Sequence, residues 1–391
     1  MSNKRDATET PDVTRPEPKD DELRFDMQGW LGTEGGPMLG EPATSGDLLP
    51  NEIPRSPTLW VWVAGIGVFV ALPQFITVTT AAEVMGLFFL MMFAMSWDIV
   101  SGYTGQLSLG HAFFFAIGGY GSAALNVLLD LSPLISIPLA TGLAILGGLL
   151  IGLPALRIKG AYLALLTLIA PFLLLRTFVL YSDVFGGTDG FTPLPDPLIG
   201  STPRAVFTVD SFQLAILSNY YFTLFLTVAI LLFLVLVTRS PIGQVFTAIR
   251  TDERVVTATG FSLVKYKLLA FLTSAGVGGF AGAIFVHSMG GSPHPDEILT
   301  LELSINVIIF AFLGGIGTIT GPVIGVLVFA FLLRFVEAVD VTIPVVGVGL
   351  SELQPIPLFV ITILVIIFMR GGLVRWLSRT VRRLVARGRQ L

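Results

Sequence analysis

Long apolar runs dominate the chain from Leu59 onward, and short polar stretches separate them. The runs are about 15 to 22 residues long, and a helix needs about 20 residues to cross the hydrocarbon core of a bilayer. Glycine and proline interrupt two of the runs, so eight or nine crossings are alternatives to the ten that we predict. An alternating strand pattern is missing, and lipid offers backbone polar groups no partner. The predicted fold class is therefore all-α, a polytopic membrane helical bundle with glycine-interrupted segments. The ten predicted crossings begin near Leu59, Ala82, His111, Leu134, Gly160, Asn219, Lys267, Leu303, Ile319 and Ile356.

Composition agrees with this pattern and divides the chain into three parts. Hydrophobic residues make up 53% and charged residues 13%, whereas soluble domains carry roughly 25% charged residues. The first 58 residues hold twelve acidic and six basic residues with many Pro and Gly, which is typical of a disordered acidic tail. A membrane domain is expected over residues 59–370 and a basic tail over residues 371–391.

Basic residues in the connecting loops predict the orientation, because Lys and Arg accumulate on the cytoplasmic side of membrane proteins. They lie at 157–159, within 239–267 and, as seven arginines without an acid, within 370–389. The opposite loops, 183–210 and 296–302, carry mainly acidic residues. With ten crossings, both termini are predicted to be cytoplasmic, in a multi-pass protein of the cell membrane. The arginine tail is expected to contact anionic lipid.

Sequence signatures of catalysis are missing. No Lys follows a Gly, so the chain has no P-loop for ATP, and HExxH, GxSxG and GxGxxG do not occur. Cysteine is absent, and there are three histidines. We expect His287 and His294 to be solvated or to cap helices instead of holding a metal. The chain is therefore predicted to be no enzyme, to hold no cofactor or metal and to bind no nucleic acid.

A polar stretch at residues 239–267, here called the docking loop, stands between two apolar runs. Ser240 can cap a helix with Pro241 at its first position, Thr251 can cap a second helix whose first turn is acidic, and Gly260 can end it. Two short helices are thus predicted to project from the membrane. They would suit a subunit that takes energy from a soluble partner, because force passes through rigid elements. An amphipathic loop on the bilayer surface is the alternative.

Two segments interrupt the apolar pattern. The first broken segment, residues 101–111, contains three glycines, while Gln106, Ser108 and His111 offer hydrogen bonds. Irregular backbone at membrane depth must line water or protein, so this segment is a candidate solute pathway. A tight cytoplasmic turn between two helices is the alternative.

The second broken segment, residues 313–322, is glycine-rich, and Gly317, Gly321 and Gly325 form a stripe with a spacing of four residues. Such a stripe allows two helices to approach closely. We expect the two broken segments to occupy matching places in two halves of the molecule. The glycines predicted to support helix packing are Gly314, Gly315, Gly317, Gly321 and Gly325.

Charged residues inside the predicted spans are few. Glu83 and Asp98 fall near opposite ends of the second span, and Arg176 and Arg334 fall towards the ends of theirs. Buried charge in a membrane is costly and is rarely kept without a use. A largely uncharged pathway is therefore predicted, with energy supplied from outside the chain. An ion-coupled secondary transporter would need a carboxylate near mid-membrane.

Four blocks in this order resemble the LivM-type permeases of branched-chain amino acid ABC importers, over about residues 84–370. The blocks are GYTGQLSLGHAFFFAIGGY (102–120), FGGTDGFTPLP (185–195), the stretch 243–285 and SINVIIFAFLGGIGTITGPVIG (304–325). The resemblance implies an ATPase coupling loop that contains Arg250, Asp252, Glu253 and Gly260. It also implies a translocation pathway near Gly105, Gln106, Ser108, Gly110 and His111.

The resemblance implies that the chain moves branched-chain or other hydrophobic amino acids into the cell by ATP-driven alternating access. The implied partners are a LivH-type second permease, two ATPase subunits and an external solute-binding protein. A urea or short-amide importer shares most of these motifs and is an alternative, and a membrane scaffold would not need the broken segments. The sequence departs from the family in its long acidic tail and in Asp98, where relatives often carry Asn. This leaves the local hydrogen bonding at Asp98 open.

Overall fold

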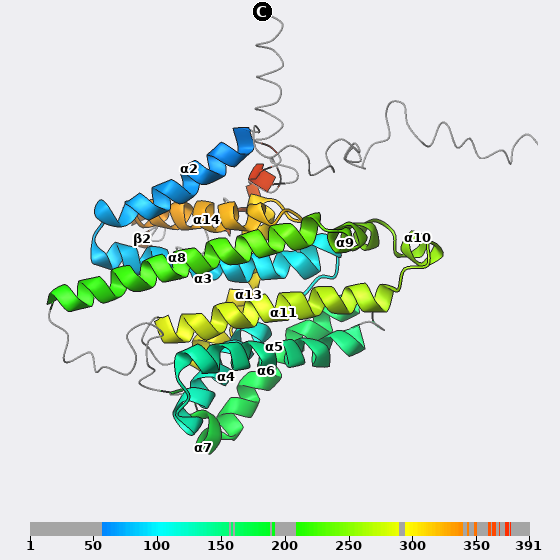
Figure 1. The fold of residues 1–391 in the computed structure, drawn as a ribbon, viewed down its shortest axis with the longest axis horizontal. Helices are drawn as coiled ribbons and strands as arrows, with labels where there is room; N and C mark the ends of the chain where they lie inside the picture. Colours follow the sequence, from blue (N-terminus) through cyan, green and yellow to red (C-terminus); the bar gives the residue numbers. More distant parts are fainter. Residues whose placement is uncertain are drawn as a thin grey trace, which may run out of the picture. The chain divides into compact units, whose positions relative to one another are not determined.

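The computed structural model describes residues 57–155, 158, 161–187, 190–191, 209–288, 294–338, 342–343 and 348–349, with scattered positions between 359 and 376 (Figure 1). The predicted acidic tail and most of the predicted basic tail lie outside the described residues.

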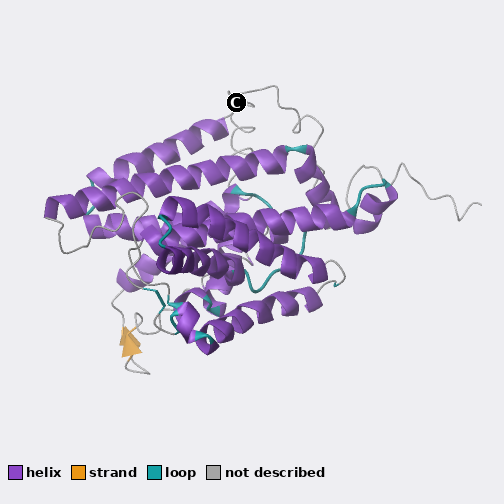
Figure 2. Cartoon of the chain, turned by 60° about the horizontal axis from the view of Figure 1, so that its bottom comes forward, coloured by secondary structure: helices purple, strands orange, loops and turns teal. Residues whose placement is uncertain are grey.

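Helices make up nearly all of the described secondary structure (Figure 2). A single antiparallel ladder pairs two strands of two residues each. The elements in chain order are α2 (Pro57–Ala71), the 3₁₀ turn η2 (Leu72–Gln74), α3 (Val78–Trp97), the π-helical turn η3 (Asp98–Tyr103), α4 (Ala112–Leu129), α5 (Pro133–Ala155), α6 (Ala161–Leu180), α7 (Ser182–Phe185), α8 (Val209–Arg239), α9 (Pro241–Thr251), α10 (Glu253–Ala258), α11 (Leu263–Ser288), α12 (Pro295–Ile298), α13 (Leu301–Gly314), α14 (Thr320–Ala338), β1 (Thr342–Ile343) and β2 (Val348–Gly349).

Seven of the described helices are long and apolar enough to cross a membrane, so the chain is a polytopic helical membrane protein. Nine of the ten predicted starts fall in or beside a described helix, and the start near Ile356 lies outside the described residues. The count of ten is not confirmed, because α2 and α13 are shorter apolar helices. With 14 residues, α13 is about 21 Å long and cannot cross a core of about 30 Å alone.

Helix α11 forms the centre of the bundle. It is the most buried of the membrane-length helices, and it packs on α4 and α5 on one side and on α3 on the other. Figure 1 shows α8 running alongside α3, while α6 and α7 lie next to α4 and α5. The buried apolar side chains come mainly from α3, α4 and α11. The first broken segment joins α3 to α4, so it starts and ends in this core.

Glycines bring α4 and α11 into backbone contact. A Cβ atom on Gly282 would collide with the carbonyl oxygen of Phe115, and one on Gly118 would collide with that of Gly279. Close backbone approach of this kind lets helices associate in lipid, where burial of apolar area gives little driving force. The interface therefore depends on the absence of side chains at these positions.

We predict that Gly282→Ala lowers the melting temperature of the purified protein in detergent. The added methyl group must push two backbones apart, and overpacking of a filled interior costs about 1–3 kcal/mol. Gly142→Ala in α5 is the matched control, because nothing lies within 4 Å of a Cβ atom there. Alanine is the better helix former, so the control should match or exceed the wild type. A Gly282→Ala protein as stable as the Gly142→Ala protein would contradict this account of the interface.

Candidate functional site

The docking loop begins with the predicted helix cap. Ser240 has an extended backbone, its hydroxyl accepts a hydrogen bond from the Ile242 amide at 3.2 Å, and Pro241 occupies the first helical position of α9. The second predicted cap was wrong. Thr251 is the last residue of α9, and Asp252 caps α10 by accepting a hydrogen bond from the Arg254 amide at 2.7 Å. Asp252 is the capping residue because its backbone is extended, as an N-cap requires, at the junction between the two helices.

Two charged residues of the docking loop point towards the transmembrane helices. Arg250 donates from Nη1 to the carbonyl oxygen of Gly102 at 2.5 Å. Glu253 forms an ion pair with Lys267, with 2.5 Å between Oε1 and Nζ, and Lys267 is buried at the start of α11. These contacts fasten α9 and α10 to the bundle. A role of either residue in direct partner contact stays a prediction.

Three large apolar side chains in the second half of the docking loop are exposed, among exposed polar residues that include Asp252 and Arg254. Val255 is 60% exposed, Phe261 is 46% exposed and Val264 is 55% exposed, whereas Val256 is buried. Figure 1 shows α10 at the tip of the loop, beyond the ends of the neighbouring helices. Gly260 lies two residues beyond the end of α10 and has a φ of +84°, a conformation that favours glycine. The sequence analysis did not single out these three apolar residues as one surface, which we call the tip surface.

In the first broken segment, buried and exposed residues alternate from residue 104 to residue 108. Gln106 and Ser108 are 6% and 1% exposed, whereas Gly105 is exposed and Leu107 is 42% exposed. An alternation with a period of two is typical of extended backbone. The polar side chains therefore point into the protein, and Leu107 points outward. The sequence pattern Gln-Leu-Ser-Leu contains this alternation, although it does not tell which side is buried.

Backbone atoms of this segment are held by neighbouring side chains. Ser101 donates from its hydroxyl to the carbonyl of Gln106 at 3.0 Å and accepts from the amide of Ser108 at 3.1 Å, and Trp97 donates to the carbonyl of Ser108 at 2.7 Å. The side-chain carbonyl of Gln106 and the hydroxyl of Ser108 have no hydrogen-bond partner among the described residues. Buried polar atoms are nearly always paired, so these two need a partner from elsewhere.

His111 and Gly110 lie where α3, α4 and α6 meet. His111 is fully buried and stacks on Phe93, and its Nε2 is 2.8 Å from the hydroxyl of Ser96. That hydroxyl donates to the carbonyl of Phe93, so it accepts from the imidazole, whose proton is then on Nε2. A Cβ atom on Gly110 would collide with the carbonyl of Thr167 in α6. Contact of His111 or Gly110 with a solute stays a prediction.

A second buried histidine corrects an expectation. His287 is fully buried and therefore not solvated: its Nε2 is 2.8 Å from the hydroxyl of Ser122, which is 2.9 Å from that of Ser136. The three side chains are buried and join α4, α5 and α11. His294 precedes α12 and is exposed. Nothing in the sequence near His287 indicates the two serines, because they are contributed by other helices.

The second broken segment forms a tight turn between α13 and α14. Gly317 has a φ of +74° and precedes α14, so the predicted helical stripe is wrong at this position. Gly321 and Gly325 lie in α14 and face α13 at backbone distance. A Cβ atom on Gly325 would collide with the carbonyl of Phe310, and one on Gly314 with that of Gly321.

The two broken segments are in direct contact. Asp98 Oδ1 accepts a hydrogen bond from the amide of Gly317 at 2.7 Å, and a Cβ atom on Gly102 would lie 2.8 Å from the same nitrogen. Asp98 is the C-cap residue of α3, near the end of its span as predicted, and its side chain is fully buried. The carboxylate is in the interior because the break in the second segment exposes an amide that needs an acceptor. The hydrogen bond at Asp98 that the sequence left open is thereby defined.

The C-terminal part of the chain returns to the second broken segment. Gly372 is buried, with a φ of +85°, and a Cβ atom on it would collide with backbone atoms of Gly315. Gly315 ends α13 with a φ of 132°. Packing against the bundle thus continues two residues beyond residue 370, where we placed the end of the membrane domain.

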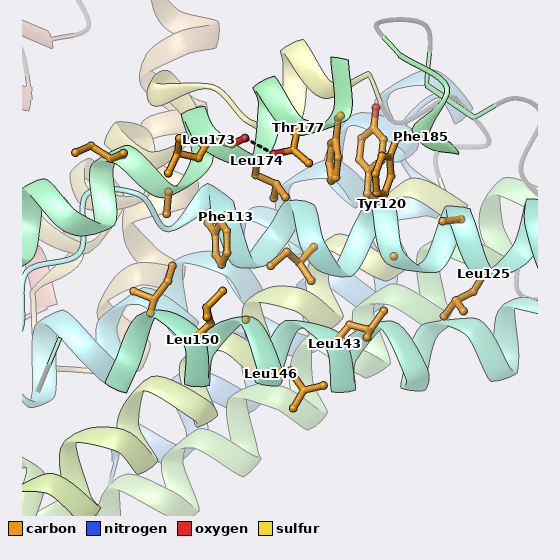
Figure 3. A pocket seen from close by; sticks show the side chains of 18 of the residues that line it. Phe113, Tyr120, Leu125, Leu143, Leu146, Leu150, Leu173, Leu174, Thr177 and Phe185 are labelled. Carbon is orange, nitrogen blue, oxygen red and sulfur yellow. Dashed lines mark hydrogen bonds between the residues drawn. The ribbon is translucent and has the colours of Figure 1, made fainter. Parts of the chain in front are cut away.

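A large apolar groove lies among α4, α5 and α6, with a volume of about 1030 Å³ (Figure 3). Leu146, Leu150 and Phe113 line one side, and α6 lines the other. Thr177, one of the few polar residues there, donates its hydroxyl proton to the carbonyl of Leu173. The lining contains no charged residue, so the ammonium and carboxylate of an amino acid would be unpaired there. No pattern in the sequence indicates this groove, because it is formed by separate helices.

Membrane-length helices, two broken segments in contact and a projecting capped loop define a polytopic membrane protein with features of a transport subunit. The family model described as branched-chain amino acid transport system, permease component, matches residues 81–370. The chain belongs to this family of permease components.

Relatives agree with the family. The high-affinity branched-chain amino acid transport system permease protein LivM of Escherichia coli is 31% identical over 320 residues, which are 76% of this chain and 71% of that protein. The LivM protein of Salmonella typhimurium is 33% identical over 245 residues, 56% of this chain and 55% of that protein. A probable LivM permease of Methanocaldococcus jannaschii is 25% identical over 240 residues, 56% of this chain and 64% of that protein. No solved structure matches the chain significantly.

We predict that single cysteines in the first broken segment react with an aqueous thiol reagent according to their exposure. The chain has no native cysteine, so each label reports one position. Leu107→Cys should react about tenfold faster than Gln106→Cys or Ser108→Cys, because thiol reactivity requires solvent access. Labelling rates of the purified chain in detergent, measured by mass spectrometry, check this. Equal rates at the three positions would contradict the observed orientation of the segment.

Proposed function

We propose that the chain is the permease subunit of an ABC importer, which moves branched-chain or other hydrophobic amino acids into the cell by alternating access. The match of the family model to residues 81–370 carries this proposal. The chain would catalyse no bond change itself and would hold no cofactor. ATP hydrolysis would belong to separate subunits, in keeping with the absence of a P-loop from the sequence.

The proposed complex contains this chain, a LivH-type second permease, two ATPase subunits and an external solute-binding protein. The family consists of permease components, which supports further subunits in general. The tip surface supports an ATPase partner in particular, since three exposed apolar side chains on a projecting loop suit insertion into a groove of another protein. Asp252, which caps α10, and Glu253, through its ion pair with Lys267, would hold that surface in place.

Both termini are proposed to be cytoplasmic, in a cell membrane. Basic residues of the docking loop and of the C-terminal arginine stretch support this orientation. The end of α3, the docking loop and the turn between α13 and α14 contact one another, so they belong to the same end of the bundle. In the proposed orientation this is the end that faces the ATPases.

The proposed solute pathway runs along the first broken segment. Leu107 presents an apolar side chain outward, which suits the side chain of a branched-chain amino acid better than urea or a short amide. Gln106 and Ser108 lie just behind it, with polar atoms that lack a partner among the described residues. Gly105, Gly110 and His111 would shape the segment.

Uptake by the reconstituted complex tests the proposed function. We expect proteoliposomes with all five proteins and ATP to accumulate leucine, isoleucine and valine, and not urea, because selectivity for apolar side chains requires apolar contacts. The chain alone should show neither ATP hydrolysis nor accumulation. Radiolabelled uptake with and without ATP is the measurement. Accumulation by the chain alone, driven by an ion gradient, would support a secondary transporter and refute the proposal.

A second prediction concerns the tip surface. Val255→Asp should abolish co-purification of the ATPase subunits and with it uptake, because a charge replaces an apolar contact and would be buried unpaired. Membrane insertion should be unchanged, since Val255 is exposed and outside the spans. Val184→Asp in α7, where the valine is 48% exposed, is the matched control and should leave ATPase co-purification intact. Wild-type assembly of the Val255→Asp complex would rule out docking at this surface.

A further inference from the structure

Arg250 occupies the point where the docking loop meets both broken segments. We propose that it is a positioning residue, through which a movement of the docking loop shifts the two broken segments together. The inference rests on the proposed function for the energy source, but the contacts that support it belong to this chain alone.

The side chain of Arg250 touches a glycine of each broken segment. Its Nη1 donates to the carbonyl of Gly102, and the same nitrogen occupies the space that a Cβ atom on Gly317 would need. Its aliphatic part lies against Gly105, where a Cβ atom would be 3.3 Å from Arg250 Cγ. One guanidinium group therefore lies at the crossing of segments that are more than 200 positions apart in the sequence.

The crossing is held together on its other side by Asp98. The carboxylate accepts from the amide of Gly317, and it fills the space in which a side chain on Gly102 would lie. The carboxylate of Asp98 and the guanidinium of Arg250 therefore occupy the space that side chains at Gly102 and Gly317 would need. This arrangement makes the first and second broken segments one mechanical unit at this point. Arg250 is the member of the unit that comes from the docking loop.

Helix α9 is built to carry a displacement to this unit. It is capped by Ser240, begins with Pro241, and buries Gly243, Phe246 and Ile249, which lie three residues apart on one face. Arg250 follows this face near the end of the helix, and α10 with the tip surface comes directly after it. A partner that pulls on the tip surface must either break the hydrogen bond to Gly102 or move the first broken segment. Such a shared element is the physical basis of coupling between two sites.

The charged side chain suits this role better than an apolar one would. The carbonyl of Gly102 is buried and accepts a hydrogen bond from a planar cation with several donors. Lysine would supply a compact ammonium on a flexible stem in its place and would lose the fixed fork of the guanidinium. Alanine at position 250 would remove the donor to the carbonyl of Gly102 and the side chain that packs against Gly105 and Gly317. Arg250→Ala should therefore weaken the coupling more than Arg250→Lys does.

The test compares variants in the complete reconstituted complex. For each one we would measure ATPase co-purification, ATP hydrolysis with and without solute-loaded binding protein, and solute molecules taken up per ATP. Arg250→Ala should retain co-purification within about twofold, as expected when no partner contact is lost. Its uptake per ATP should fall about tenfold, within the usual range for loss of coupling between sites. Arg250→Lys should restore part of this ratio.

A matched control removes an arginine elsewhere. Arg176→Ala changes an exposed arginine of α6, nine residues beyond Thr167, and should preserve assembly, hydrolysis and uptake per ATP. Val255→Asp gives the opposite pattern to Arg250→Ala, because it should lose co-purification itself. Loss of co-purification in Arg250→Ala would show that the arginine is a docking contact and would overturn the proposal. A wild-type ratio of uptake to hydrolysis in Arg250→Ala would overturn it too.

A second measurement keeps the inference testable if folding or transport fails. If Arg250→Ala does not reach the membrane, Arg250→Lys decides, and a wild-type ratio of uptake to hydrolysis in that variant would refute the proposal. If the wild-type complex transports none of the solutes, the proposed function fails. The coupling is then measured as the change in the labelling rate of Leu107→Cys when ATP hydrolysis is trapped with vanadate. That change should be present with Arg250 and reduced with Arg250→Lys, and an undiminished change in the variant would refute the inference.

Discussion

The hydrogen bond from the Gly317 amide to Asp98 meets a requirement on which the arrangement of this bundle depends. A backbone group that leaves a helix inside a membrane protein must find its partner in the protein, because lipid supplies none. Two helices of this chain break close together, and each break leaves a polar group unpaired. Asp98 accepts from the amide on one side, and Arg250 donates to the carbonyl of Gly102 on the other. A structural need of the bundle has thus placed two opposite charges next to both broken segments.

Much of the fold could be predicted because its causes are local. Apolar runs of about 20 residues identify membrane helices, and nine of the ten predicted starts fall at described helices. The cap at Ser240 was predictable, since Ser before Pro at a helix start is a strong local pattern. The cap at Asp252 was missed because Thr251 and Asp252 are both good caps, and the choice depends on where α9 ends. Short helix α13 was taken as a crossing because its glycine-rich continuation is also apolar.

The orientation of the candidate site residues could not be predicted, because it depends on partners that are distant in sequence. Arg250 and Glu253 look like surface charges of a projecting loop, yet Gly102 and Lys267 draw both towards the bundle. Asp98 looks peripheral until Gly317, 219 positions later, provides the amide that it accepts from. The inward direction of Gln106 and Ser108 follows from hydrogen bonds of Ser101 and Trp97 to their backbone, which the alternating pattern alone does not reveal.

The contact between Gly372 and Gly315 has a practical consequence for protein engineering. Gly372 is seated against the turn that follows α13, with no room for a side chain of its own. A truncation that removes Gly372, or a substitution of this glycine, would therefore disturb the turn between α13 and α14.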